Sequence, residues 1–245
     1  LKTEVVLNGV EYGNGMIAFL MIIAAVVIGV SSFAYLHNKK KVDFYHSIPV
    51  RREALFGAQF SGGIFMVGAA YGFNLLLLTG VALSYGVPVG RILGAMAGGW
   101  ALNMLYYALM YSVAVAAMMM TGNIVVGVLG TGVFFFFLPG VMMLLGWYCE
   151  TFFVTTARYM WSSDQSPFTW GVRYLSPFSV YINSFGWKMN ELVKHVPELI
   201  CTILAFLAVA TLDLELYRKR PSEAAGKAMA FKKSMPPVRI LLVLG

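Results

Sequence analysis

The residues of this sequence that could do chemistry are few and scattered. Its histidines, His37, His46 and His195, fall in different predicted regions, and no Ser/His/Asp set or H-E-x-x-H motif accompanies them. Cys149 and Cys201 lie in or near separate hydrophobic segments and lack metal-ligand spacing. The sequence therefore predicts no catalytic, metal or cofactor site in this chain.

The sequence also lacks the motif that ATP hydrolysis requires. No G-x-x-x-x-G-K-[ST] motif occurs, and the nearest candidate, Gly226-Lys227, has Pro221 in place of the first glycine. Ala228 stands where the motif needs a hydroxyl for magnesium. We therefore predict that the chain is not an enzyme, and that any work against a gradient uses a separate ATPase subunit or an ion gradient.

The composition is that of a polytopic membrane protein. Hydrophobic residues make up 59% of the chain and charged residues 12%, whereas soluble domains carry about 25% charged residues. The net charge of +7 concentrates at predicted span ends and in the tail, so lipid phosphate and membrane orientation explain it without nucleic acid. We predict an all-α membrane bundle in which lipid is a partner and nucleic acid is not.

Hydropathy predicts five spans, because each apolar run is long enough to cross the hydrocarbon core as a helix. They cover about 16–36, 54–83, 91–120, 124–148 and 192–217. The basic loop 37–53 and the basic tail 218–239 then fall on one side, which the positive-inside rule places in the cytoplasm. The chain starts without an initiator methionine and ends in a new apolar run, 240–245, so we expect a fragment of a longer membrane domain.

The loop 37–53 is patterned like a short surface helix. Val42, Tyr45 and Ile48 recur at i, i+3 and i+6, and Pro49 ends the helix. Such an apolar stripe fits a groove of another protein, although an amphipathic helix lying on lipid has the same pattern. The residues predicted to bind the partner are Val42, Asp43, Phe44, Tyr45, His46, Ser47, Ile48, Pro49, Arg51 and Arg52.

The segment 150–191 is predicted to lie outside the cell. It is dense in aromatic residues, which favour the headgroup layer, and is interrupted by Pro167 and Pro177. We expect short interfacial or re-entrant helices here; a folded external loop with aromatic anchors is the alternative.

Polar groups inside the spans are sparse. Asn74 and Asn103 are the candidate residues of a cargo path, and Gln59 is a third polar residue, although hydrogen bonding between helices is the commoner role. Gly68 and Gly72, and again Gly90, Gly94 and Gly98, have the G-x-x-x-G spacing of close helix packing or dimer contact.

Carboxylates are absent from the middle of every predicted span. Asp213 and Glu215 fall near the inner end of the last span, beside Arg218 and Lys219, where a solvated ion pair is expected. An ion-coupled transporter would need a buried charge, so this pattern argues against one and favours ATP coupling with an apolar or amphipathic cargo.

The order of segments and the loop motif resemble the type 2 ATP-binding-cassette (ABC) exporter permeases. In that family a charged start, a short apolar helix, a small polar residue, a proline and a basic residue form the coupling helix. Residues 40–52, KKVDFYHSIPVRR, follow this pattern, and Leu175-Ser176-Pro177 resembles the family's proline-containing turn before the last core span. The resemblance implies docking of the loop on an ABC ATP-binding subunit, with ATP and magnesium bound in that subunit.

The basic tail that begins at Tyr217 is similar to a larger Gram-positive variant of the family. The resemblance implies a homodimer or heterodimer of permeases in the bacterial plasma membrane that exports a peptide, lipid or drug. The chain departs from the family where a lysine run replaces the acidic residue that opens the coupling segment, leaving Asp43 as its carboxylate. An ion-coupled or facilitative transporter and a membrane sensor of antimicrobial peptides remain open as alternatives.

Overall fold

The computed structural model describes residues 12–86, 89–153, 167–185, 187 and 189–231. Its regular elements in these ranges are helices, and no strand occurs among them. The elements are α2 (Gly15–Phe33), η1 (Ala34–His37), α3 (Lys39–Ser47), α4 (Arg52–Ser84), α5 (Val89–Met120), α6 (Ile124–Phe152), α8 (Pro167–Tyr174), α9 (Pro177–Ser184), η2 (Met189–His195), α10 (Val196–Lys219) and η3 (Ser222–Ala224).

Five of the described helical segments are long and apolar enough to cross a membrane, which confirms the predicted helical membrane bundle. They are Gly15–His37, Arg52–Ser84, Ile92–Met120, Ile124–Phe152 and Leu192–Lys219, and they coincide with the five predicted spans. The predicted loop 37–53 contains α3, and the described part of the external segment contains α8 and α9.

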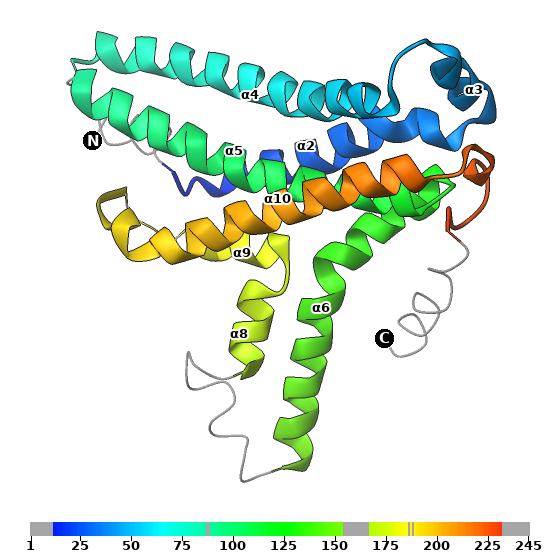
Figure 1. Cartoon of the computed structure of the whole chain (residues 1–245). Helices are drawn as coiled ribbons and strands as arrows, with labels where there is room; N and C mark the ends of the chain where they lie inside the picture. Colours follow the sequence, from blue (N-terminus) through cyan, green and yellow to red (C-terminus); the bar gives the residue numbers. More distant parts are fainter. Residues whose placement is uncertain (1–11, 87–88, 154–166, 186, 188, 232–245) are drawn as a thin grey trace.

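The helices α2, α4, α5 and α10 lie side by side along one direction, with α3 at one end of the bundle (Figure 1). The helix α6 packs on α5 and then turns away from the others, with α8 beside it (Figure 1). Pro139 lies inside α6, where it removes one backbone donor from the helix and favours a bend.

Helix α5 is the centre of the bundle. In its most apolar stretch 89% of residues are buried, whereas the corresponding share in the other four membrane-length helices is 11 to 28%. It contacts α2, α4, α6, α9 and α10. The outer helices therefore pack on α5 and leave large apolar side chains exposed on the rest of their surface.

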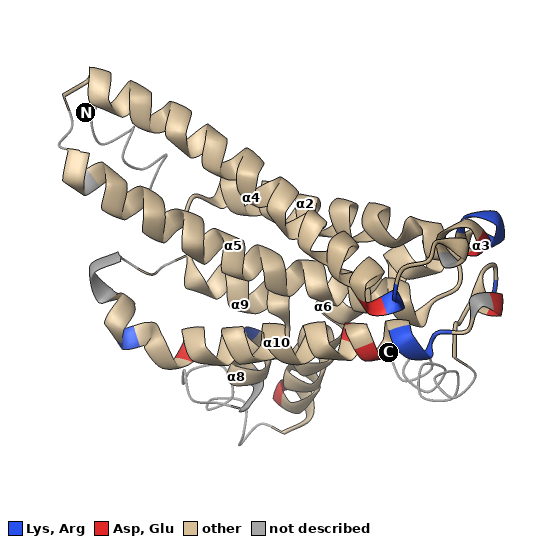
Figure 2. Cartoon of the chain, turned by 45° about the horizontal axis from the view of Figure 1, so that its top comes forward, with Lys and Arg blue, Asp and Glu red and all other residues tan. Residues whose placement is uncertain are grey.

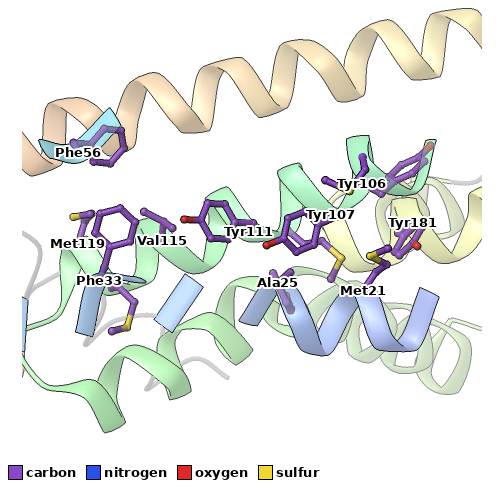
Figure 3. Packing of buried hydrophobic residues seen from close by; sticks show 14 of the residues in the cluster. Met21, Ala25, Phe33, Phe56, Tyr106, Tyr107, Tyr111, Val115, Met119 and Tyr181 are labelled. Atoms are coloured by element: carbon purple, nitrogen blue, oxygen red, sulfur yellow. The ribbon is translucent and has the colours of Figure 1, made fainter. Parts of the chain in front are cut away.

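The core along α5 is built from tyrosines (Figure 3). Tyr106, Tyr107 and Tyr111 are fully buried, and side chains of α2, α4 and α9 meet them. The Tyr107 hydroxyl donates to the carbonyl of Gly63 at 3.1 Å, and the Tyr111 hydroxyl donates to the carbonyl of Gln59 at 3.4 Å. These bonds satisfy buried hydroxyls and hold α4 on α5.

Three asparagines start three of the helices. Asn14, Asn38 and Asn123 each accept a hydrogen bond from the backbone nitrogen two residues further on, at 2.9 to 3.1 Å. Asparagine is a favoured N-cap because its side-chain oxygen satisfies a free N–H of the first turn. The starts of α2, α3 and α6 are thus specified locally by the sequence.

The two G-x-x-x-G patterns have different surroundings. Trp100 of α5 lies against Gly68 and Gly72, and its indole nitrogen donates to the Gly68 carbonyl at 3.1 Å. Gly90 and Gly94 have open space beside their Cα atoms. The first pattern is therefore used for packing within this chain, whereas Gly90 and Gly94 of the second lie on an open face of α5.

The close approach of α4 to α5 yields a stability prediction. A Cβ added at Gly63 would clash with the Tyr111 hydroxyl oxygen, and Tyr111 is fully buried, so its ring has little room to move. Gly63→Ala should lower the free energy of unfolding by about 1 to 3 kcal/mol, the usual effect of overpacking.

Gly57→Ala is the matched control, because it lies on the same helix and its added Cβ meets open space. The control should leave the melting temperature in detergent unchanged or raise it, since alanine is the better helix former. Equal melting temperatures for the two variants would contradict this packing of α4 on α5.

Candidate functional site

Helix α3 is the predicted partner-binding segment, and its ends are sharply defined. Asn38 caps its first turn, and the helix stops at Ser47. Ile48 is extended, with φ −69° and ψ 132°, as expected for a residue that precedes a proline. Pro49 therefore separates α3 from the start of α4.

The face of α3 that carries the predicted apolar stripe is turned toward the chain itself. Val42 is 2% exposed, and Tyr45 and Ile48 are half-buried. The Tyr45 ring packs on Tyr35 with centroids 4.4 Å apart. Phe44, by contrast, is 65% exposed, so it is the large apolar side chain that α3 presents outward.

Five of the remaining predicted partner-binding residues are exposed. The side chain of His46 lies outside the described part of the structure. The exposed ones are Asp43, Ser47, Pro49, Arg51 and Arg52.

The charged residues of the described chain gather mainly at the α3 end of the bundle (Figure 2). Helix α3 and the segment after α10 meet there, and an open pocket of about 370 Å³ lies between them. Arg218 also pairs with Glu53 of α4 at 2.8 Å, with both side chains about half exposed. The pocket is lined by Lys39, Asp43, Glu223 and Lys227.

Arg220 connects the C-terminal end of α5 to the end of η1 through buried hydrogen bonds. Its side chain is buried, and its Nη1 donates to the carbonyls of Met118 at 2.8 Å and Met119 at 2.6 Å. Its Nη2 donates to the carbonyl of Leu36 at 3.3 Å. The guanidinium thus satisfies free carbonyls at the C-terminal end of α5, where the helix dipole also favours a cation.

Burial lowers the pKa of Arg220 to about 10. The guanidinium is still charged at neutral pH, so its bonds to the three carbonyls are charge-assisted and strong.

The segment after α10 folds back on the turn between α5 and α6. The Gly226 nitrogen donates to the Gly122 carbonyl at 2.8 Å, and the Ala230 nitrogen donates to the Met120 carbonyl at 2.9 Å. Residues 220–231 are therefore part of the folded end. We call η1, α3, the α5–α6 turn and residues 220–231 the basic platform.

An aromatic layer connects the basic platform to the spans. The hydroxyls of Tyr35 and Tyr217 are 3.0 Å apart and buried. The Phe56 ring of α4 lies 5.5 Å from the Tyr217 ring and 5.7 Å from the Phe33 ring, measured between centroids. Helices α2, α4 and α10 thus meet α3 through one continuous set of rings.

The two residues of the predicted cargo path are not brought together. Asn103 is buried, and its amide nitrogen donates to the Tyr71 hydroxyl at 3.0 Å while its oxygen accepts from the Tyr181 hydroxyl at 2.6 Å. Asn74 is exposed on α4 and donates to a carbonyl of its own helix at 2.8 Å. Asn103 joins α4, α5 and α9, which is the structural role of asparagine between helices.

The short helices α8 and α9 of the predicted external segment pack against α6, and α9 also contacts α5 (Figure 1). Ser176 caps α9 by accepting from the Phe178 nitrogen at 3.2 Å, and its hydroxyl also donates to the carbonyl of Phe135. Pro177 is in the first turn of α9, where a missing N–H does no harm. The Leu175-Ser176-Pro177 turn thus fixes α9 on α6.

Asp213 is a candidate functional residue that the sequence pattern did not identify. Asp213 of α10 is fully buried, with 0% exposure, and neither carboxylate oxygen has a hydrogen-bond partner among the residues that the structure describes. The prediction of a solvated ion pair for Asp213 is therefore wrong. Glu215, the other member, does form an exposed pair with Lys219 at 2.7 Å.

The spacing of these residues accounts for the difference. Side chains two apart on a helix point in different directions, so Asp213 and Glu215 cannot share a face. Asp213 and Tyr217 are four apart and do share one, and Tyr217 is also buried. The four-residue spacing was the signal in the sequence that could have placed Asp213 in the interior.

Metal-binding geometry is absent from the part of the chain that the structure covers, since no three His, Cys, Asp or Glu side chains gather there. What the described residues offer is a charged end with one exposed aromatic side chain, and a buried carboxyl group within a span.

The Arg220 contacts predict a large effect of truncation. Arg220→Ala removes three charge-assisted hydrogen bonds and leaves buried carbonyls without donors, so the free energy of unfolding should fall by about 2 to 4 kcal/mol. Lys219→Ala is the control, because its pair with Glu215 is exposed and should contribute nothing measurable. Thermal unfolding in detergent checks both variants. A similar melting temperature for the two would refute the stabilising role of the Arg220 hydrogen bonds.

Comparison with family models, with curated proteins and with solved structures found no match to this chain. Its functional assignment therefore depends on the geometry described above and on the resemblance of residues 40–52 to a coupling helix.

Proposed function

We propose that the chain is a membrane-spanning permease subunit of an ATP-driven exporter, similar to the type 2 ABC permeases. The observation that carries the proposal is α3, a short capped helix between two membrane-length helices that holds Phe44 outward at the charged end. An exposed aromatic side chain surrounded by charges is typical of a protein-binding surface. ATP and magnesium would bind in the partner ATPase, and this chain would not be an enzyme.

The surroundings of α3 support docking on protein over burial in lipid. A helix that lies on lipid turns its apolar stripe to the membrane. Here Val42 is packed inside the chain, and the outward positions near Phe44 include Lys40, Lys41 and Asp43. A single large apolar residue among charges favours a pocket in a partner subunit.

The aromatic layer offers a mechanical connection from the docking surface to the spans. A displacement of α3 would move Tyr45, whose ring packs on Tyr35. Tyr35 is hydrogen-bonded to Tyr217 of α10, and Tyr217 contacts Phe56 of α4. Closure of the ATPases would in this way tilt α2, α4 and α10 together and open a path for cargo between two permease subunits.

The dimer and its cargo belong to the same proposal. The open face at Gly90 and Gly94 and the outward course of α6 leave apolar surface for a second permease, identical or different. We propose export of an apolar or amphipathic cargo, a peptide, lipid or drug, across the bacterial plasma membrane. A membrane sensor of antimicrobial peptides that uses the same docking surface is the alternative.

A second candidate function has one specific observation in its favour. An ion-coupled transporter needs an ionisable group buried within a span, and Asp213 is such a group. Both candidates use the same bundle, and they differ in whether an ATPase binds at α3.

The docking proposal is tested at Phe44. Phe44→Asp should reduce capture of the ATPase subunit by full-length protein in mild detergent at least tenfold, because a charge would replace the exposed anchor of the interface. The variant should still insert and keep its melting temperature, since Phe44 is largely outside the core.

Asn123→Asp is the matched control, because it adds the same charge at the α3 end and aspartate also caps a helix. The captured protein is identified by its nucleotide-binding motifs and by ATP hydrolysis of the purified complex. Undiminished capture by Phe44→Asp, or no ATPase bound to the wild type, would overturn the proposal.

A further inference from the structure

Asp213 is a carboxyl group buried within a membrane-length helix, which is an energetically unfavourable position. It lies inside the last membrane-length segment, six residues or about 9 Å along the helix axis from the end of α10 at Lys219. It is fully buried on a helix that packs on α5 and α4. Ionisable residues within spans are costly and are typically functional.

The surroundings of Asp213 favour the neutral carboxylic acid over the ionised carboxylate. Among the described residues no donor reaches either carboxylate oxygen, and Asp213 has no part in the ion pairs at the end of α10. An isolated carboxylate is poorly solvated in such a site, whereas the neutral acid is tolerated. A side chain with no surface accessible to water also leaves no room for a hydrated metal ion.

We propose that Asp213 is a proton-binding site within the membrane span, which holds its proton while α10 is packed on α5. The ligand is one proton, taken up by the carboxylate to give the neutral acid and returned to water when the site opens. The nearer exit is the charged end, because Asp213 is close to that end of α10. The site does not depend on the proposed ATPase partner.

The ionisable groups around Asp213 are few. From α5, Tyr111 is close enough to interact with it electrostatically, and its hydroxyl is already bonded to the Gln59 carbonyl. From α4, Arg52 and Glu53 are at the start of the helix, with Glu53 paired to Arg218. From η2, Lys194 and His195 lie at the other end of α10, about 27 Å away along the helix. On α10 itself the groups are Glu215, Tyr217, Arg218 and Lys219.

The position of Asp213 also connects the proton to the basic platform. Tyr217 follows on the same face, one turn closer to the helix end, and its hydroxyl bonds to Tyr35 beneath α3. A movement of α10 that exposes Asp213 would therefore also disturb the aromatic layer. Proton release and movement of α3 would in that case be coupled in both directions.

The test measures protonation of Asp213 in purified full-length protein reconstituted in lipid. Infrared spectra of wild type minus Asp213→Asn should show the carbonyl band of a protonated carboxylic acid at neutral pH. Glu215→Gln is the control, because Glu215 is exposed on the same helix, and its difference spectrum should lack that band. Absence of the band from the Asp213→Asn difference would show an ionised Asp213 and overturn the proposal.

Thermal unfolding against pH gives an independent readout. The folded state holds one proton more than the unfolded state, so wild-type stability should fall as pH rises above the range in which an unfolded aspartate ionises. Relative to Asp213→Asn, the folding equilibrium constant of wild type should fall by about tenfold per pH unit. Parallel pH profiles for the two proteins would refute the proton site.

A second route covers an Asp213→Asn variant that does not fold. Wild-type protein with carbon-13 in its aspartate side-chain carboxyls should show the protonated band at the isotope-shifted position at neutral pH. The same band should persist in a labelled variant that combines Asp43→Asn with Asp164→Asn, in which Asp213 is the remaining aspartate. A spectrum with only ionised aspartate bands would reject the proposal. Both measurements use the permease chain alone, so their failure is distinct from a failure to bind an ATPase.

Discussion

The burial of α5 is the constraint on which the rest of the structure depends. A helix surrounded by other helices in a membrane must satisfy each of its polar groups within the protein. Tyr107, Tyr111 and Asn103 do so by bonding to backbone or side chains of α4 and α9. Each such bond fixes the position of a neighbouring helix, so the polar groups of α5 determine how the bundle is assembled.

The same requirement explains the basic platform. Helix α5 ends inside the protein, and its last carbonyls need donors that water does not supply. Arg220 reaches them from a segment about 100 residues later in the chain, and the backbone of residues 226–230 completes the end of the helix. Helix α3 rests on this folded end through its contacts with η1 and η3, so a helix that looks like a surface appendage in sequence is packed against the rest of the chain.

The sequence could predict what depends on local pattern. Apolar length fixed the five spans, proline after Ser47 ended α3, and the basic clusters fell at one end. Local pattern does not say which surface covers an apolar face. The stripe at Val42 and Tyr45 is apolar whether this chain or a partner covers it; this chain buries Val42 and packs Tyr35 on Tyr45, which stays half-buried. Arg220 was unforeseen because its acceptors are backbone carbonyls, which no side-chain pattern records.

The buried Asp213 weakens the inference that scarce charge in the spans favours ATP coupling over ion coupling. A scarcity of charged residues favoured ATP coupling only as long as every carboxylate lay in water. One neutral, buried acid is compatible with either energy source, because a proton can be a coupled ion or can adjust the packing of α10 on α5. The two mechanisms are then separated at α3, since an ATP-driven exporter is expected to bind its ATPase there and an ion-coupled transporter is not.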